Sequence, residues 1–409
     1  MNQIKQGYKQ TKVGIIPEDW EVVKLGKVTK INPNNKNLPE NFIYIDLESV
    51  VKGKLLKQNF ISKYEAPSRA QRVLKKNDIL FQMVRPYQMN NLFFEFDGNY
   101  VASTGYAQIR TNQSDKYIFQ YIHLKRFVDK VLEKCTGSNY PAINSSDLSD
   151  ILIILPPLKE QEKIAEILTT WDEAITKQIE LLEAKELQKK ALMQKLLSGE
   201  VRFSGFSDEW EEVRLGEIGE FKTSSIDKII NENERLVNLI NYMDVYRNKH
   251  IDKNFRCSKT SLKEEQYEKV NLKKGDILFT PSSETPDDIG HSAVIIEDLP
   301  NTVYSYHLVR FRPQKSIDLK FSGYVFNNID ILKEFAKRAN GSTRFTLSIK
   351  DFNETKAKLP SLPEQQKIAE VLSLADDEIN LLKNELEELK LQKKALMQKL
   401  LTGQVRVKV

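Results

Sequence analysis

Polar side chains gather directly after two apolar runs, Asp78 to Phe81 in the first half of the chain and Asp276 to Phe279 in the second. The first run is followed by amides, a cation and an aromatic ring: Gln82, Arg85, Tyr87, Asn90 and Asn91. The second is followed by hydroxyls and a carboxylate: Thr280, Ser282, Ser283 and Glu284. Side chains of these types donate and accept hydrogen bonds, but neither set pairs a nucleophile with a base. The pattern predicts binding loops.

Motifs of catalysis and cofactor binding are absent from the sequence. It has no GxxxxGK[ST] phosphate loop, no GxGxxG, and no Asn/Asp-Pro-Pro-Tyr motif of an amino-methyltransferase. The four histidines His123, His250, His291 and His307 lack zinc-ligand spacing. The acidic residues between Pro281 and Gly290 stand among Pro and Ser, so we interpret them as a polar loop. We expect a chain that binds no metal and no cofactor and is not itself an enzyme.

Charge is unevenly distributed along the 409 residues. The net charge is +5, but residues 1–155 hold 22 Lys and Arg against 15 Asp and Glu. A basic domain favours a polyanionic partner such as nucleic acid. Two cysteines, Cys135 and Cys257, lie in different halves, and the polar first ten residues do not read as a signal peptide. We therefore expect a cytoplasmic protein.

An internal repeat organises these loops. QKKALMQKLLSGEVR, from Gln188, and QKKALMQKLLTGQVR, from Gln392, are identical at 13 of 15 positions at an offset of 204. LPPLKEQEKIAEIL, from Leu155, and LPSLPEQQKIAEVL, from Leu359, match at 10 of 14 positions at the same offset. The openings around Trp20 and Trp210 also correspond. The chain therefore predicts two similar halves, each closed by a long helix.

Apolar residues in both helical segments follow alternating steps of four and three, the pattern of a coiled-coil seam. In the second segment they are Ile368, Leu372, Ala375, Ile379, Leu382, Leu386, Leu389, Leu396 and Leu400. In the first they are Ile164, Leu168, Trp171, Ile175, Leu182, Leu192 and Leu196. Gln178, Lys185 and Lys189 interrupt the first seam, and we interpret them as facing a partner subunit. The evident mate of each helix is the other copy.

Short β-rich runs precede each long helix. KKNDILF, from Lys75, and KKGDILF, from Lys273, are each predicted as a tight turn and a buried strand. A helix is predicted over Tyr117 to Lys134 and another over Ser322 to Arg338, each followed by Gly-Ser. The predicted domains are 1–155, 156–200, 201–358 and 359–409. The predicted fold is two tandem α/β (α+β) recognition domains separated by two long helices, which form an antiparallel coiled coil with pseudo-twofold repetition.

In these motifs the chain resembles the specificity (S) subunits of Type I restriction-modification systems. The resemblance rests on PEDWEVVKLG, LPPLKEQEKIAEIL and QKKALMQKLLSGEVRF, together with their near-copies, and covers essentially the whole chain. It implies two domains that each recognise one half of a split, asymmetric site in double-stranded DNA. It also implies two modification (M) subunits that carry S-adenosylmethionine and restriction (R) subunits that use ATP with magnesium. The S subunit of the family is not catalytic.

With that resemblance, the polar loops become candidates for contact with base edges and phosphates. In the first domain they are Arg69, Arg72, Gln82, Arg85, Tyr87, Asn90, Asn91, Ser103, Thr104, Tyr106, Ser138, Asn139 and Tyr140. In the second they are Arg247, Lys249, His250, Arg256, Thr280, Ser282, Ser283, Glu284, Tyr306, His307, Ser342, Thr343 and Arg344. Because the first loop is cationic and the second acidic, we expect two half-sites of different sequence.

The helices are expected to set the gap between the half-sites. A helix of about 35 residues spans on the order of 50 Å, or roughly 15 base pairs. Two alternatives stay open from sequence: a coiled-coil scaffold that binds only protein, and an enzyme with an unrecognised site. The first predicts no salt-dependent binding to DNA, and the second predicts activity from the chain alone.

Overall fold

The computed structural model describes residues 4–34 and 37–409 and divides the chain into two units. Unit 1 consists of Met1–Ile179 with Asn384–Val409, and unit 2 of Glu180–Lys383. Two long helices, α5 (Leu158–Ser198) and α12 (Leu362–Leu401), each contribute one part to each unit. The expected tandem of mixed α/β units is confirmed. The predicted domain boundaries kept each long helix whole and remain a prediction.

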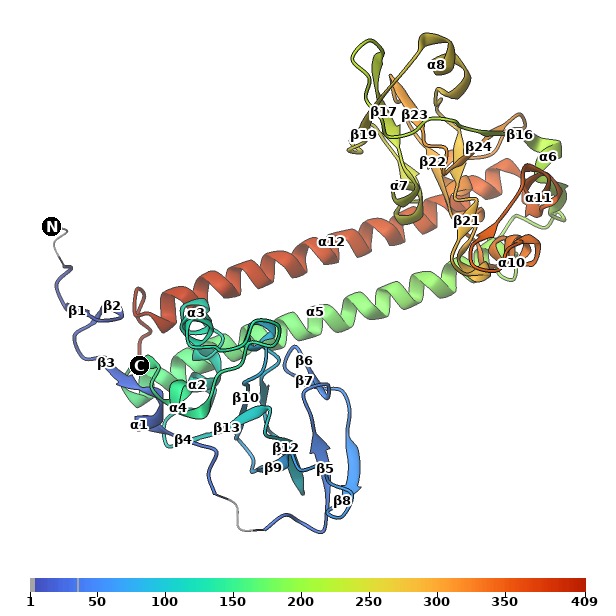
Figure 1. The fold of residues 1–409 in the computed structure, drawn as a ribbon. Coiled ribbons are helices and arrows are strands. Elements are labelled where there is room, and N and C mark those ends of the chain that lie inside the picture. The colour runs from blue at the N-terminus through green and yellow to red at the C-terminus, as the bar shows by residue number, and fades with distance from the viewer. Residues whose placement is uncertain (1–3, 35–36) are drawn as a thin grey trace. The chain divides into compact units, whose positions relative to one another are not determined.

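Unit 1 is built from short strands, short helices and the ends of α5 and α12 (Figure 1). Its strands are β1 (Tyr8–Thr11), β2 (Gly14–Pro17), β3 (Glu21–Lys24), β4 (Thr29–Ile31), β5 (Asn41–Ile45), β6 (Val50–Val51), β7 (Lys54–Leu55), β8 (Asn59–Ser62), β9 (Ala70–Val73), β10 (Ile79–Gln82), β11 (Leu92–Phe93), β12 (Tyr100–Ser103), β13 (Tyr106–Thr111) and β14 (Leu152–Leu155). Its short helices are α1 (Leu25–Val28), η1 (Pro86–Gln88), α2 (Asp115–Tyr121), α3 (Lys125–Glu133) and α4 (Ser145–Ser149).

Two four-stranded sheets carry unit 1, in the orders β11-β10-β13-β4 and β8-β5-β12-β9. The strand β10 reads Ile-Leu-Phe-Gln and is buried on both faces, as its continuous apolar run predicts. Asp78 fixes the turn before it, because its carboxylate accepts from Lys75 N at 2.7 Å and pairs with Arg110 Nε at 2.7 Å. This anchored strand therefore fixes the position at which the following loop begins, at Met83.

Unit 2 repeats this plan with additional helices. Its strands are β15 (Glu211–Arg214), β16 (Gly219–Thr223), β17 (Arg235–Ile240), β18 (His250–Ile251), β19 (Ser258–Leu262), β20 (Ile277–Phe279), β21 (Ser282–Ser283), β22 (Ser292–Ile295), β23 (Thr302–Tyr304), β24 (Val309–Pro313), β25 (Phe345–Thr346) and β26 (Lys356–Leu359). Its short helices are α6 (Leu215–Ile218), α7 (Tyr242–Arg247), α8 (Glu264–Val270), η2 (Pro286–Asp288), α9 (Leu319–Val325), α10 (Ile329–Arg338) and α11 (Ile349–Glu354).

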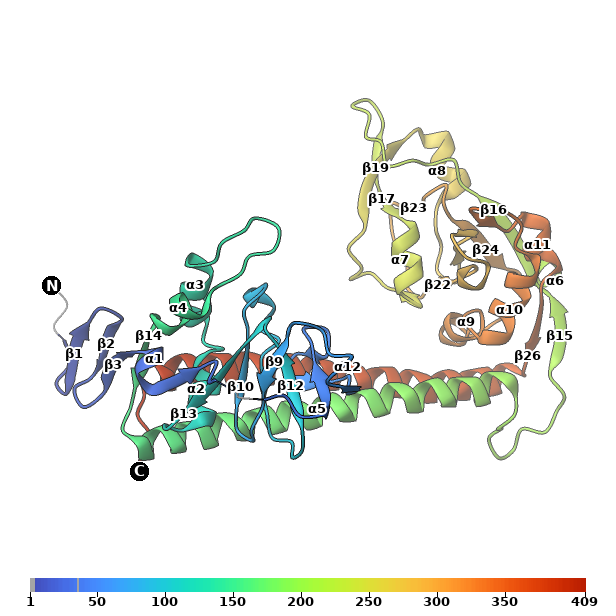
Figure 2. The same cartoon turned by 60° about the horizontal axis from the view of Figure 1, so that its bottom comes forward.

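The strand β20 lies in the middle of a five-stranded sheet of order β16-β24-β20-β22-β18, beside a three-stranded sheet β19-β17-β23. Asp276 fixes the preceding turn as Asp78 does, accepting from Lys273 N at 2.8 Å and pairing with Arg312 Nε at 2.6 Å. In Figure 2, α10 and α11 lie near the strand pair β15–β26. The shared Lys-Lys-x-Asp-Ile-Leu-Phe sequence therefore encodes the same anchored strand in both units.

The two helices predicted as continuous are each broken. Tyr117 to Lys134 forms α2 and α3, and Ser322 to Arg338 falls within α9 and α10. At the first break His123 Nδ1 bonds to Phe119 O at 2.7 Å, and at the second Asn327 Nδ2 donates to Gly323 O at 2.9 Å. In a helix, the backbone N–H of a residue donates to the carbonyl four residues earlier. Here the side chain of that residue bonds to this carbonyl instead, so the helix ends and the chain turns.

Within each unit the parts of α5 and α12 lie side by side and antiparallel. In unit 1, Asp172 pairs with Lys393 at 2.5 Å and Gln178 Nε2 donates to Glu385 at 3.1 Å. In unit 2, Lys185 pairs with Glu378 at 2.7 Å and Lys189 pairs with Asp376. In both units, the residue numbers of the α12 partners fall as the residue numbers along α5 rise, which is the order of antiparallel helices. Interpreting Gln178, Lys185 and Lys189 as facing a partner subunit was therefore wrong, since all three bond to the sister helix.

The predicted seam residues are buried or half-buried in their units, and none is fully exposed. Ile164 and Leu168 join the core of unit 1, and Ile368 and Leu372 join that of unit 2. Among residues 4–34 and 37–409, no helix has both the length and the apolar character for crossing a membrane.

Candidate nucleic-acid interface

In unit 1 the loop after β10 is bonded to the loop after α3. Arg85 N donates to Pro141 O at 2.7 Å, Ile143 N donates to Met83 O at 3.1 Å, and Val84 forms a β-bridge with Ala142. Two segments that are more than 50 residues apart in the chain thus present one surface. This explains why the sequence places polar residues in both.

Arg85 and Tyr140 meet on this surface. Their guanidinium and ring centroid lie 4.2 Å apart, and Tyr140 is 64% exposed. Arg85 has φ 54, a left-handed conformation that is uncommon for a residue with a Cβ and that is often associated with functional sites. Tyr87, 49% exposed, lies in the adjacent turn η1. A cation and two aromatic rings are the side chains that contact phosphates and bases.

Unit 2 builds the corresponding surface with the cation on the other loop. Here β21 pairs with β25 through Ser282 and Thr346, and Arg344 donates to Ser282 Oγ at 3.0 Å. Arg344 stands 204 residues after Tyr140, so the loop that supplies the aromatic ring in unit 1 supplies the cation in unit 2. Gly341 (φ 146) makes the tight turn, since a Cβ there would lie 2.0 Å from Arg344 O.

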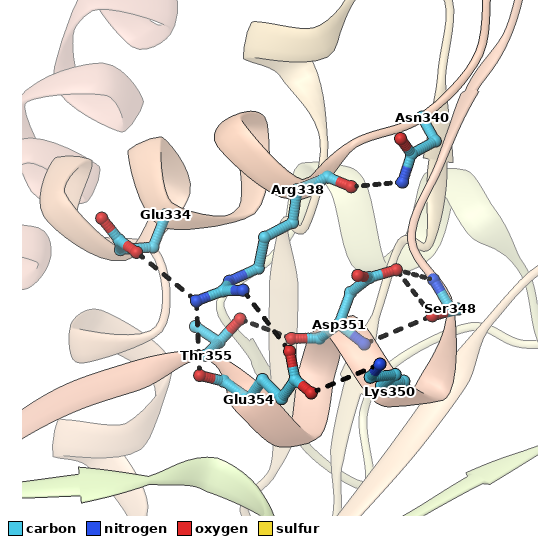
Figure 3. A network of polar contacts seen from close by, with 8 residues as sticks. All are labelled: Glu334, Arg338, Asn340, Ser348, Lys350, Asp351, Glu354 and Thr355. Atoms are coloured by element: carbon cyan, nitrogen blue, oxygen red, sulfur yellow. Dashed lines mark hydrogen bonds and ion pairs between the residues drawn. The ribbon is translucent and has the colours of Figure 1, made fainter.

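A polar network holds the base of the Arg344 loop (Figure 3). The carbonyl of Arg338, at the end of α10, accepts from Asn340 Nδ2 at 2.9 Å. Its guanidinium lies 3.9 Å from Glu334 and 3.8 Å from Glu354. Ser348 and Asp351 close the start of α11 with a capping box. The network connects the end of α10 to α11 and fixes the two ends of the loop between them.

Other residues predicted to contact DNA are fully or partly accessible to solvent. They take no part in the contacts of Arg85 with Tyr140 or of Arg344 with Ser282. Arg69 O accepts from Thr104 N at 2.8 Å, and the rings of Tyr306 and His307 lie 3.8 Å apart. Asn90 accepts from Lys52 N at 3.0 Å. The exposed ones are Arg69, Ser138, Asn139, Arg247, Arg256, Glu284, Tyr306, Ser342 and Thr343. Arg72 is partly buried in β9, and burial lowers the pKa of its guanidinium.

Six predicted contact residues lie in the interior and are corrected to structural roles: Gln82, Asn91, Ser103, Tyr106, Thr280 and Ser283. Asn91 is 1% exposed, accepts from Gln82 N at 2.8 Å and bonds to His123 Nε2 at 3.2 Å. Thr280 exchanges backbone bonds with His291 and Gly290. The side chains of Gln82 and Asn91 bond to backbone N–H groups of the loop itself, because buried backbone groups need partners.

Lys249 and His250 are half-buried in unit 2, and the prediction that they contact DNA stays a prediction. Lys249 Nζ lies 3.5 Å from Met193 Sδ and 5.4 Å from the centroid of the Tyr324 ring, while His250 bonds to Lys320 O. Burial and the neighbouring Lys189 lower the pKa of Lys249 to about 8. These contacts fasten the β18 strand to α9 and to the α5 segment of the unit. Neither residue belongs to the Ser282–Arg344 surface.

The sequence-based prediction missed the two three-residue turns beside these loops. In η1 the last residue is Gln88, and in η2 it is Asp288. Tyr246 and His291 both bond to Asp288. The available signal was a proline that opens a three-residue turn a few positions after each Asp-Ile-Leu-Phe strand.

Comparison with known proteins places the chain among one group of DNA-recognition proteins. Residues 17–184 and 207–391 match the family described as the Type I restriction modification DNA specificity domain. The MjaVIII specificity subunit of Methanocaldococcus jannaschii, a Type I restriction enzyme, is 29% identical, with 96% of this chain and 94% of the relative covered. The putative MjaX specificity subunit of the same organism is 27% identical, with 99% and 98% covered.

Solved structures share the fold. A chain from a structure of the type I restriction-modification system aligns with TM-score 0.65 and 23% identity, covering 95% of this chain and 99% of the other. The HsdS subunit from Thermoanaerobacter tengcongensis aligns with TM-score 0.52 and 23% identity, covering 95% and 98%. The two ranges that match the family, residues 17–184 and 207–391, fall on the two repeated halves of the chain.

Proposed function

The chain belongs to the Type I restriction-modification DNA specificity family, and we propose that it recognises a bipartite, asymmetric DNA site with one half-site for each unit. It is the DNA-recognition subunit of such a system and is not the catalyst. The observation that carries the two-part site is the repeated surface. In each unit a strand loop and a helix loop meet, and each meeting point carries an arginine, Arg85 or Arg344.

The different chemistry of the two surfaces supports an asymmetric site. Unit 1 presents Arg85 with Tyr87 and Tyr140, whereas unit 2 presents Arg344 with Ser282 and the exposed Glu284. Arginine reads guanine edges or holds phosphate, and a carboxylate accepts from the amino group of cytosine. Identical half-sites would need matching side chains, which the two units do not have.

Membership of the family implies that the chain assembles with modification and restriction subunits of a Type I system. We further propose two modification subunits, one for each repeat, which carry S-adenosylmethionine, and restriction subunits that supply ATP-dependent cleavage with magnesium. The chain itself would bind no cofactor and would act in the cytoplasm, in keeping with its free thiols at Cys135 and Cys257. The paired helices α5 and α12 are proposed to set the gap between the half-sites.

The test is Arg85→Ala against Arg344→Ala, assayed by binding to duplexes that carry single base changes in one half-site. If each arginine reads a base, each variant should lose roughly ten- to a hundredfold of discrimination at one position of one half-site. Lys76→Ala and Lys253→Ala remove the same charge elsewhere in the two units and should keep both half-sites. An equal loss on every duplex would assign the arginines to phosphate contact, and no salt-dependent DNA binding would contradict the proposed function.

A further inference from the structure

The two turns η1 and η2 hold their last residues at the reading surfaces. Each is a three-residue turn that begins with proline and follows the buried strand, Pro86–Gln88 after β10 and Pro286–Asp288 after β20. Gln88 is exposed, and the Asp288 side chain is 45% exposed. Proline fixes φ at the first residue of each turn, which lowers the entropy cost of forming the turn.

Each of these residues is bonded on one side by groups of its own unit. Gln82, which is 2% exposed, donates through Nε2 to Gln88 Oε1 at 2.8 Å and accepts from Asn90 N at 3.0 Å. Asp288 accepts from the Tyr246 hydroxyl at 3.1 Å and lies 2.9 Å from His291 Nε2. Tyr246 is itself stacked on Tyr242, whose hydroxyl donates to Ser282 O at 2.8 Å. The side chains are therefore oriented before any ligand binds.

The bonding capacity that remains differs between the two residues. An ionised carboxylate offers about four acceptor positions, and Tyr246 and His291 use two of them. Asp288 therefore keeps acceptors and has no donor. Gln88 keeps both hydrogens of its amide and one lone pair on Oε1. The first pattern suits the exocyclic amino group of cytosine, and the second suits the N6 and N7 edge of adenine.

An acidic side chain on a DNA-binding surface needs a reason, because it repels phosphates. The donors Tyr246 and His291 disperse the charge of Asp288 and fix its direction. In the described part of unit 2, its neighbour Asp287 is exposed and accepts no hydrogen bond from a side chain. Two neighbouring carboxylates therefore differ in one respect: Asp288 is hydrogen-bonded by side chains of its unit, and Asp287 is not.

We propose that Gln88 and Asp288 are specificity-determining residues, with Gln88 reading adenine in one half-site and Asp288 accepting from the amino group of cytosine in the other. The inference rests on the proposed function and specifies the base chemistry of its two surfaces. It extends that function from the arginines to a matched pair of turn residues.

The experiment selects duplexes from a randomised library with the full chain, bound to the modification subunits of its own system, and sequences the selected DNA. Asp288→Asn should relax the cytosine preference at one position of one half-site by about ten- to a hundredfold and leave the other half-site unchanged. Asp287→Asn removes the same charge one residue away and should return the motif of the unsubstituted chain.

A second variant keeps the inference testable if Asp288→Asn does not fold. Gln88→Glu should convert a preferred adenine to cytosine at one position of the other half-site, because the new side chain can only accept. Unchanged motifs with both variants, or an equal loss on all duplexes, would overturn the inference while the proposed function stands. If the unsubstituted chain selects no two-part motif, the proposed function falls, and the inference falls with it.

Discussion

His123 and Asn327 occupy equivalent positions 204 residues apart, and each ends a short helix by bonding to the carbonyl four residues back. Only the histidine can change its charge. Its Nδ1 donates to Phe119 O, and its Nε2 accepts from Asn91 Nδ2 at 3.2 Å, which is the neutral tautomer. Burial lowers the pKa of His123 from its ordinary value of 6.5, and Lys393 lowers it further.

This predicts a pH dependence that belongs to unit 1. Because the folded state binds the proton less readily than the unfolded state, neutral His123 contributes fully to the free energy of unfolding above about pH 6.5. This contribution is lost as the pH falls through the pKa of His123 in the folded state. His123→Asn keeps the bond to Phe119 O, as Asn327 does in unit 2, and does not titrate. The unfolding free energy of the unsubstituted chain should fall more steeply between about pH 7 and pH 5 than that of the variant. Parallel curves for the two proteins would contradict this.

At the scale of residues, composition and local spacing predict the accessibility of single side chains less well than they predict helices. The loop after β10 was predicted to be binding because it holds amides and an arginine, and Arg85 and Tyr87 are indeed accessible. Gln82 and Asn91 have the same chemistry but face inward, because the loop folds back and needs their bonds. Asp288 was missed because its partner Tyr246 is 42 residues away, and pairs of that separation leave no local pattern.

At the scale of elements, a buried acid ties each long helix to the strands of its unit. In unit 1, Glu160 at the start of α5 accepts from Trp20 Nε1 at 3.0 Å and from Arg406 at 2.7 Å. In unit 2, Glu364 accepts from Trp210 at 3.2 Å and from Arg202 at 2.7 Å. Each carboxylate is 1% exposed. The repeated Trp, Glu and Arg of the sequence therefore form one clasp in each unit.

Arg406→Ala should loosen unit 1 and leave unit 2 intact. It leaves the buried Glu160 with the indole donor and removes an ion pair with Asp19 at 2.8 Å. Because Arg406 is 40% exposed, we expect a cost of about 2 kcal/mol, below that of a fully buried pair. Hydrogen exchange should show reduced protection of β3, β14 and the start of α5, with unit 2 unchanged.

Arg202→Ala should produce the converse result, with loss of protection in β15 and β26. Lys408→Ala, which alters an exposed lysine of the C-terminal segment, is the matched control and should change neither unit. Equal loss in both units from either arginine substitution would show that the clasps do not act within their own units.

The helices themselves could be predicted well because their information is local. Steps of four and three over about 40 residues indicate paired helices, and α5 and α12 extend over 41 and 40 residues. The break between α2 and α3 was not predicted, since the apolar positions continue through His123 and only a side-chain bond ends the helix. The seam interruptions were misread because Lys185 and Lys189 find carboxylates on the sister helix.

At the scale of the whole molecule, two units of similar plan share the same pair of helices. The order of elements, the anchored strand and the clasp are repeated, whereas the loops differ. A repeated scaffold with unlike loops can bind two unlike half-sites. The sequence repeat predicted the two similar units, whereas the two DNA half-sites were expected from the family resemblance. The base preferences could not be predicted, since they depend on contacts between distant segments.

We proposed that α5 and α12 fix the gap between two separately recognised half-sites. The most direct measurement removes residues 179–185 and 378–384 together, facing heptads by the pairing of Gln178 with Glu385 and Lys185 with Glu378, and repeats the duplex selection. Seven helical residues correspond to roughly 10 Å, or about three base pairs. We expect the same two half-sites with a gap shorter by about that amount. Unchanged spacing in the selected DNA would contradict it.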